Sequence, residues 1–227
     1  MRIICFIISL FLLQSCRNNS ESNTEKGAEN NSVKKDKTEL VEECIQKDTT
    51  TILGTKVKYI YNDGKYKISY SDKFYNRTYD SLYACDFNKS TGLWDFVPKL
   101  HSETKSNLIF TNILWTSSGG NPEPLEYYAI VLPKNKLGKA FEKDFFIECD
   151  ENYLVYGDPK NDNIHIINLE TKKTQLINLI PKPELSRSPT SSILETQIEK
   201  KVFSIKYQSL DKNDATIIIE KDFKIII

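Results

Sequence analysis

The side chains of this chain that could do chemistry are few: five cysteines and two histidines among 227 residues, with carboxylates scattered between them. A cysteine becomes a nucleophile when a neighbouring base or cation favours its thiolate. Cys85 alternates with Tyr83 and Phe87, and neither histidine is placed to act as its base. Cys149 follows Ile147 at the same two-residue spacing. The pattern predicts small, buried apolar side chains at both cysteines rather than a catalytic thiol.

Disulfide bonding is the other use of cysteine that the sequence allows. Cys44, Cys85 and Cys149 are the candidates, because Cys5 and Cys16 belong to the N-terminal segment. Three cysteines permit one bridge with one remaining thiol, or no bridge, and the sequence leaves all three pairings open.

Neither a metal site nor a cofactor is predicted. His101 and His165 have no cysteine or acid at the spacing of zinc ligands. Residues 86–90 place oxygen side chains at alternate positions, as a calcium loop does, but Thr91 replaces the turn glycine and Val97 the closing glutamate. A hairpin turn explains the same residues.

A loop of small polar residues, 117–122, is the predicted contact surface, because loops on a rigid sheet commonly carry binding. An aromatic residue precedes it and a tyrosine pair follows on the return strand. The candidate contact residues are Trp115, Gly119, Gly120, Tyr127 and Tyr128. The alternative interpretation is an ordinary turn over a buried tryptophan.

Charge excludes one large class of function. The chain has 31 lysines and arginines against 31 aspartates and glutamates. Such a balance gives no broad positive field for phosphates, so we expect no nucleic-acid partner.

The N-terminus has the pattern of an export signal. Arg2 precedes an uncharged apolar run, residues 3–13. The run is shorter than the ~20 residues of a membrane-spanning helix and fits the apolar region of a signal peptide. It ends in Leu13-Gln14-Ser15-Cys16, which resembles the lipobox of bacterial lipoproteins. The resemblance implies cleavage before Cys16, lipid on its thiol and, with Arg17 rather than aspartate next, an outer-membrane location in the cell envelope.

Three regions follow from these patterns. Residues 1–15 are the predicted signal peptide, and residues 16–50 contain the lipidated cysteine, a polar tether and a short helix with Leu40, Val41, Cys44 and Ile45 on one face. Residues 51–227 form the folded domain.

The folded domain is predicted to be all-β and antiparallel. Val57, Tyr59 and Tyr61 alternate with polar residues before the turn residues 62–64, and alternation resumes after it. Further hairpins are expected at 83–97, 108–132, 153–179 and 202–220, with a last strand at 223–227. The hairpins resemble blades of β-propellers, although their spacing is irregular; a sandwich or open barrel is the alternative.

We therefore predict a lipid-anchored envelope protein that acts as a non-catalytic binding module, with the membrane and an unknown protein or glycan as its partners. One alternative is an immunity-type lipoprotein that neutralises a toxin in the periplasm. Another is a glycan-acting enzyme that uses paired carboxylates among Asp80, Asp86 and Asp95.

Overall fold

A computed structural model describes residues 46–88, 93–116, 124–158, 163–183 and 190–227, and every regular element in these ranges is a β-strand. The signal sequence, Cys16, the tether and the short helix expected before residue 46 all lie outside the described residues. No helix in the described part of the chain is long and apolar enough to span a membrane.

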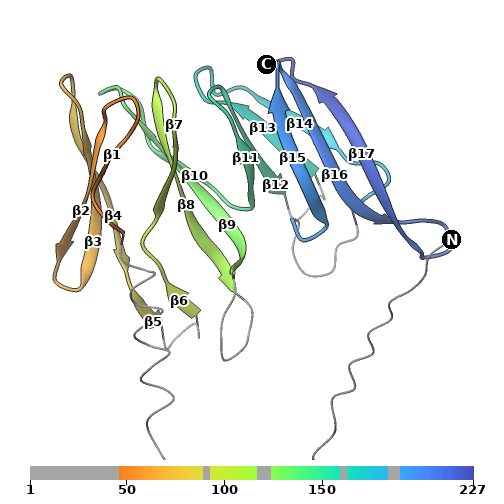
Figure 1. Ribbon diagram of the computed structural model, residues 1–227, viewed down its shortest axis with the longest axis horizontal. Helices are drawn as coiled ribbons and strands as arrows, with labels where there is room; N and C mark the ends of the chain where they lie inside the picture. Colours follow the sequence, from red (N-terminus) through yellow and green to blue (C-terminus); the bar gives the residue numbers. More distant parts are fainter. Residues whose placement is uncertain (1–45, 89–92, 117–123, 159–162, 184–189) are drawn as a thin grey trace, which may run out of the picture.

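The strands form four antiparallel sheets that follow one another in chain order, each a meander of consecutive strands (Figure 1). The first sheet contains β1 (Thr49–Thr50), β2 (Lys56–Asn62), β3 (Lys65–Ser71) and β4 (Asn76–Ala84). The second contains β7 (Lys99–Glu103), β8 (Asn107–Thr116), β9 (Pro124–Pro133) and β10 (Phe141–Lys143). The third contains β11 (Phe146–Cys149), β12 (Tyr153–Asp158), β13 (Asn163–Asn168) and β14 (Thr174–Asn178). The fourth contains β15 (Ile193–Glu199), β16 (Val202–Leu210) and β17 (Thr216–Lys224), and a small hairpin of β5 (Asp86–Asn88) and β6 (Leu93–Asp95) lies between the first two sheets in sequence.

The turn between β2 and β3 shows how local sequence sets this topology. Asp63 and Gly64 both have positive φ, 50° and 76°, as a two-residue hairpin turn requires. Val57 then pairs with Tyr70, and Tyr59 with Ile68, so that apolar side chains gather on one face. The predicted hairpin is confirmed.

The four sheets pack face to face through three apolar clusters. Val57 and Ile68 of the first sheet pack against Leu108 and Phe110 of the second. Alternate residues of the second sheet turn the other way, where Ile109 packs against the third. Both faces of the second sheet are therefore buried.

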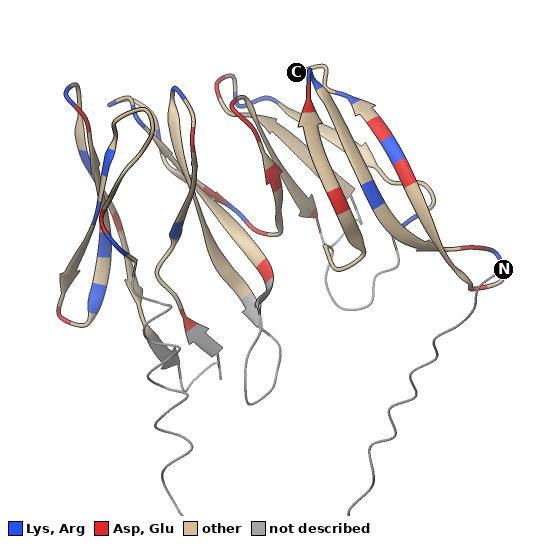
Figure 2. Cartoon of the chain, viewed as in Figure 1, with Lys and Arg blue, Asp and Glu red and all other residues tan. Residues whose placement is uncertain are grey.

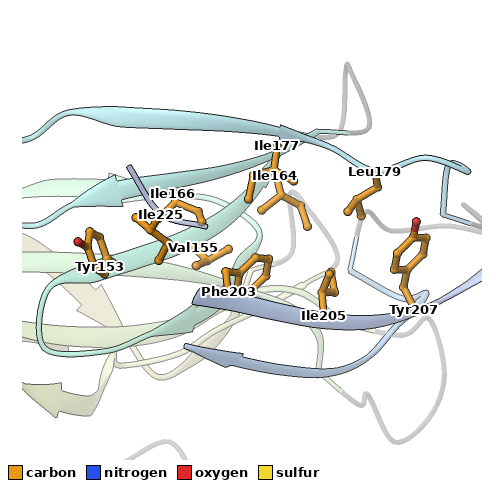
Figure 3. Packing of buried hydrophobic residues seen from close by; sticks show 10 residues of the cluster. All are labelled: Tyr153, Val155, Ile164, Ile166, Ile177, Leu179, Phe203, Ile205, Tyr207 and Ile225. Atoms are coloured by element: carbon orange, nitrogen blue, oxygen red, sulfur yellow. The ribbon is translucent and has the colours of Figure 1, made fainter. Parts of the chain in front are cut away.

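The cluster between the third and fourth sheets is the largest of the three (Figure 3). Side chains from the two sheets point toward one another, with Val155 and Ile166 on one side and Phe203 and Ile205 on the other (Figure 3). Ile225, beyond the end of β17, completes the cluster. Among the described residues, no apolar cluster joins the fourth sheet to the first.

The all-β, antiparallel prediction is confirmed, and the sheets follow one another as blades do in a propeller. The expected separate strand at 223–227 is wrong. β16 has nine residues and β17 pairs with it throughout, from Thr216 to Lys224, so the chain does not turn before residue 223. The hairpin patterns also gave no indication of β7, β10 or β15.

Replacing Leu108 by alanine should lower the free energy of unfolding by about 3 kcal/mol, because the side chain is fully buried between two sheets. Urea denaturation measures this loss. The matched control is Leu137→Ala, since Leu137 is almost completely exposed, and it should change stability by less than about 0.5 kcal/mol. Equal effects of the two substitutions would contradict the packing described above.

Candidate functional site

A hollow of about 670 Å³ opens where the ends of three strands converge. Its lining comes from the loop after β1 (residues 51–53), from β7 and the residues after it (100–105), and from the turn after β11 (149–151). β1, β7 and β11 are the first strands of three successive sheets. The hollow therefore lies on the side of the molecule where the first strands end, and it is assembled by the packing of the sheets.

Glu103 positions the loop that forms one wall. Thr55 Oγ1 donates a hydrogen bond to its Oε1 (2.5 Å), and Lys134 Nζ forms an ion pair with the same oxygen (2.5 Å). The Leu53 backbone N–H donates a hydrogen bond to its Oε2 (3.1 Å). Burial raises the pKa of this carboxyl, but the hydrogen bonds from Lys134, Thr51, Thr55 and Leu53 outweigh burial and lower the pKa overall. Glu103 is thus an ionised anchor between the first and second sheets.

Three residues of the lining, His101, Ser102 and Cys149, carry no charge at neutral pH. His101 lies edge-on to the Phe146 ring, with centroids 5.1 Å apart, and burial lowers its pKa, so the imidazole is neutral. Ser102 Oγ lies 3.4 Å from Cys149 Sγ. Burial raises the pKa of the Cys149 thiol to about 11. A thiol held protonated in this way is a poor nucleophile.

The rim combines exposed aliphatic side chains with acidic ones. Ile52 is fully exposed and Leu53 more than half exposed. Across the hollow, Glu151 forms an exposed ion pair with Lys105 at 3.5 Å. Asp150 accepts hydrogen bonds from the backbone of its own turn and so holds that wall in place. The hollow therefore suits an apolar or uncharged group whose neighbour is basic.

The predicted contact residues do not form one surface. Tyr127 is exposed, whereas Tyr128, on the opposite face of β9, packs against the cluster between the first two sheets. Asn112 Nδ2 donates a hydrogen bond to the Tyr128 hydroxyl (2.9 Å), and burial raises the pKa of this tyrosine to about 12. The backbone of Trp115 lies in β8 in register with Glu126. Gly119 and Gly120 lie outside the described residues.

The structure narrows the cysteine pairings. Cys85 is disulfide-bonded and Cys149 is a free thiol, so both pairings that include Cys149 are excluded. The expectation that Cys149 is an apolar side chain rather than a nucleophile agrees with its raised pKa and its packing against the cluster between the second and third sheets.

The remaining candidates are dispersed. His165 is half-buried and stacks on Tyr156, with ring centroids 5.1 Å apart. In the searched part of the chain, no group of three or more potential metal ligands is present. Asp80 is exposed on β4, and Asp86 and Asp95 are register partners in β5 and β6. The hollow is lined by none of these three acids.

Comparison of the chain with protein-family models, with curated proteins and with solved structures finds no significant match to any of them.

Sequence reasoning missed the hollow because its residues are far apart in the chain; Cys149 follows His101 by 48 residues. One local signal was present. Ile52 and Leu53 are adjacent aliphatic residues in a turn that closes at Gly54, where the chain has φ 89°. Two large aliphatic side chains in a turn are a sign of a contact surface.

Glu103→Gln should lower the free energy of unfolding by about 3 kcal/mol at neutral pH, because Lys134 then stays buried without its counter-charge. The folded-state pKa of Glu103 is lowered, so its stabilisation is present above the unfolded pKa and is lost as pH falls through the folded pKa. The difference between the variant and the native chain should therefore shrink toward acidic pH. Urea titrations at neutral and acidic pH measure it.

The control is the double variant Glu103→Gln/Lys134→Met, which removes both charges. It should be less destabilised than the sum of the two single variants. Additive losses would show that the two side chains do not interact.

Alkylation of Cys149 in the folded chain should be slow at neutral pH and rise about tenfold for each pH unit over roughly pH 7 to 9, because its pKa is about 11. Mass spectrometry of iodoacetamide-treated chain measures the rate, with urea-unfolded chain as the reference for an ordinary thiol. A plateau near neutral pH would indicate an activated thiolate and would restore a catalytic interpretation.

Proposed function

We propose that the chain is a lipid-anchored protein of the bacterial outer membrane that binds a protein partner through the hollow and carries out no chemistry on it. The lipobox-like Leu13-Gln14-Ser15-Cys16 and the following Arg17 support the anchor and the location. The disulfide of Cys85 supports an exported protein, since such bonds persist in oxidising compartments.

The observation that carries the binding proposal is the rim of the hollow. Ile52 and Leu53 extend into solvent from a loop that Glu103 holds to the second sheet through Leu53 N–H and Thr55. A single exposed aliphatic residue is common, but a pair on a fixed loop beside a hollow is typical of a contact surface. The volume of the hollow lies within the range of known ligand pockets, roughly 300–1,000 Å³.

The lining favours a protein over a glycan. Glycan sites present aromatic faces for stacking, whereas the described lining consists of aliphatic, hydroxyl, thiol and acidic side chains with one imidazole and one lysine, Lys105. An apolar side chain of a partner would contact Leu53 and Leu100, and a basic neighbour would meet Asp150 and would compete with Lys105 for Glu151. β7, the end strand of its sheet among the described residues, runs along the same hollow and can guide an extended segment.

Cys16→Ser should abolish incorporation of labelled palmitate and release the protein from the membrane fraction, because the acyl chains on this residue provide the permanent attachment. Metabolic labelling followed by fractionation measures both. Cys149→Ser is the matched control and should keep the label. Label that persists in Cys16→Ser would contradict the proposed anchor.

A photoreactive amino acid at position 52 should form one discrete cross-linked adduct in living cells, because Ile52 lies on the rim of the hollow. The same amino acid at Leu137, an equally exposed aliphatic position outside the lining, is the matched control. Leu53→Asp should remove the adduct while leaving the thermal unfolding midpoint nearly unchanged, since Leu53 is largely exposed. Identical adducts from positions 52 and 137 would contradict the assignment of the hollow as the contact surface.

A further inference from the structure

The first sheet turns a row of lysines away from the rest of the molecule. Val57 and Ile68 face the second sheet, and because side chains alternate along a strand, the neighbouring positions face outward. These positions include Lys56, Lys58, Lys65 and Lys67, which we call the lysine face (Figure 2). Three of the four are exposed and Lys67 is half-buried.

Acidic side chains of the same molecule do not neutralise the positive charge of the lysine face. Among the described residues, none of its four lysines takes part in an ion pair. Asp80, beside the inward-facing Tyr79 on β4, is exposed on the same side of the sheet. The face therefore has an excess of positive charge.

The other end of the row of sheets has the opposite charge. On the outward face of the fourth sheet, Lys206 forms ion pairs with Glu195 (3.6 Å) and with Glu220 (3.2 Å). These two carboxylates neutralise the charge of the lysine. Glu199 and Asp222 share that face with Lys224, and Glu199 pairs with Lys200 at 3.0 Å. The outward face of the fourth sheet thus has four acids against two lysines and a small negative excess, whereas the lysine face is positive.

We propose that the lysine face lies against the anionic headgroup phosphates of a phospholipid membrane, with the fourth sheet directed away from it. This inference rests on the proposed anchor, since the described chain begins at Gln46, just before β1 of the same sheet. Cys16 is 30 residues earlier, and a flexible chain of that length would have a mean span of roughly 30 Å. The anchor thus holds the first sheet, rather than the fourth, close to the lipid.

The magnitude of the attraction agrees with a tethered contact. Each lysine near an anionic surface strengthens partitioning roughly fivefold, so four lysines give several hundredfold. That is weak for a free protein but sufficient for one that an anchor already confines to the surface. The attraction acts within a Debye length, about 8 Å at physiological salt, so it requires the face to approach the membrane closely.

A second copy of the chain fits the lysine face less well. Exposed ion pairs between two flat, polar faces contribute little each, and large side chains that could form an apolar centre are few on either face. Head-to-tail association of the two charged ends is therefore the competing outcome of the test.

The test is amine acetylation of the full lipidated chain in vesicles, read lysine by lysine by mass spectrometry. In vesicles of equal parts phosphatidylcholine and phosphatidylglycerol, the lysine face should be labelled several-fold less than in pure phosphatidylcholine, and high salt should remove the difference. Lys201 and Lys212, exposed at turns near the fourth sheet, are internal controls and should be labelled equally in both. Equal labelling of the lysine face in both vesicles would overturn the proposal. Concentration-dependent protection in phosphatidylcholine alone would overturn it in favour of a second copy.

A second measurement separates this inference from the anchor. Unlipidated Cys16→Ser chain should co-sediment weakly with phosphatidylglycerol vesicles at low salt, and the variant with Lys56, Lys58, Lys65 and Lys67 replaced by glutamine should lose this binding at least tenfold. The matched control replaces four exposed lysines elsewhere, Lys173, Lys200, Lys201 and Lys212, by glutamine. Equal loss of vesicle binding in both quadruple variants would overturn the proposed role of the lysine face even if the anchor is correct. Loss of binding in the lysine-face variant alone would support that role even if palmitate labelling fails.

Discussion

Burial of both faces of the two middle sheets is the constraint on which the rest of the structure depends. In β8, Leu108 and Phe110 pack against the first sheet, and Ile109 between them packs against the third, all without exposed surface. Such a sheet is stable only between two others, because either face would otherwise expose a continuous apolar surface. In the part of the chain that the structure describes, the four sheets therefore form one row, and the outward faces of the two end sheets are left free to carry charge.

Hydrogen bonds between the first and second sheets supplement their apolar packing and fix how the two sheets are oriented. Arg77 of β4 donates hydrogen bonds to the carbonyl oxygens of Pro133, Asn135 and Gly138 in the loop after β9, and the Tyr70 hydroxyl also bonds to Pro133 O. These bonds join the first sheet to the second on either side of Lys134, the ion-pair partner of Glu103, so they act at the same end of β9 as the Glu103 contacts. Together these contacts hold the first sheet against the second beside the hollow, and they fix the direction in which the outward face of the first sheet points.

The sequence predicted the class of fold well because alternation of apolar and polar residues directly indicates strands with one buried face. The hairpin around Asp63 and Gly64 follows from it, whereas the pairing of β8 with β9 was expected from two apolar runs that flank a turn-rich loop. The repeat remained hidden: β1, β7, β11 and β15 begin at residues 49, 99, 146 and 193, at intervals of 50, 47 and 47 residues. Irregular turns and the short strands β1 and β10 conceal this period. The hollow could not be predicted, since it depends on how three sheets pack rather than on any local spacing.

The central claim is that the hollow at the ends of β1, β7 and β11 is covered by a partner in the cell envelope. Hydrogen–deuterium exchange tests it directly, comparing the chain in isolated envelopes with the purified chain in detergent. The account predicts slower amide exchange in the envelope for β7 and residues 51–54, with no change for β16, which lies in the fourth sheet. Unchanged exchange at β7, or slower exchange confined to β16, would contradict it.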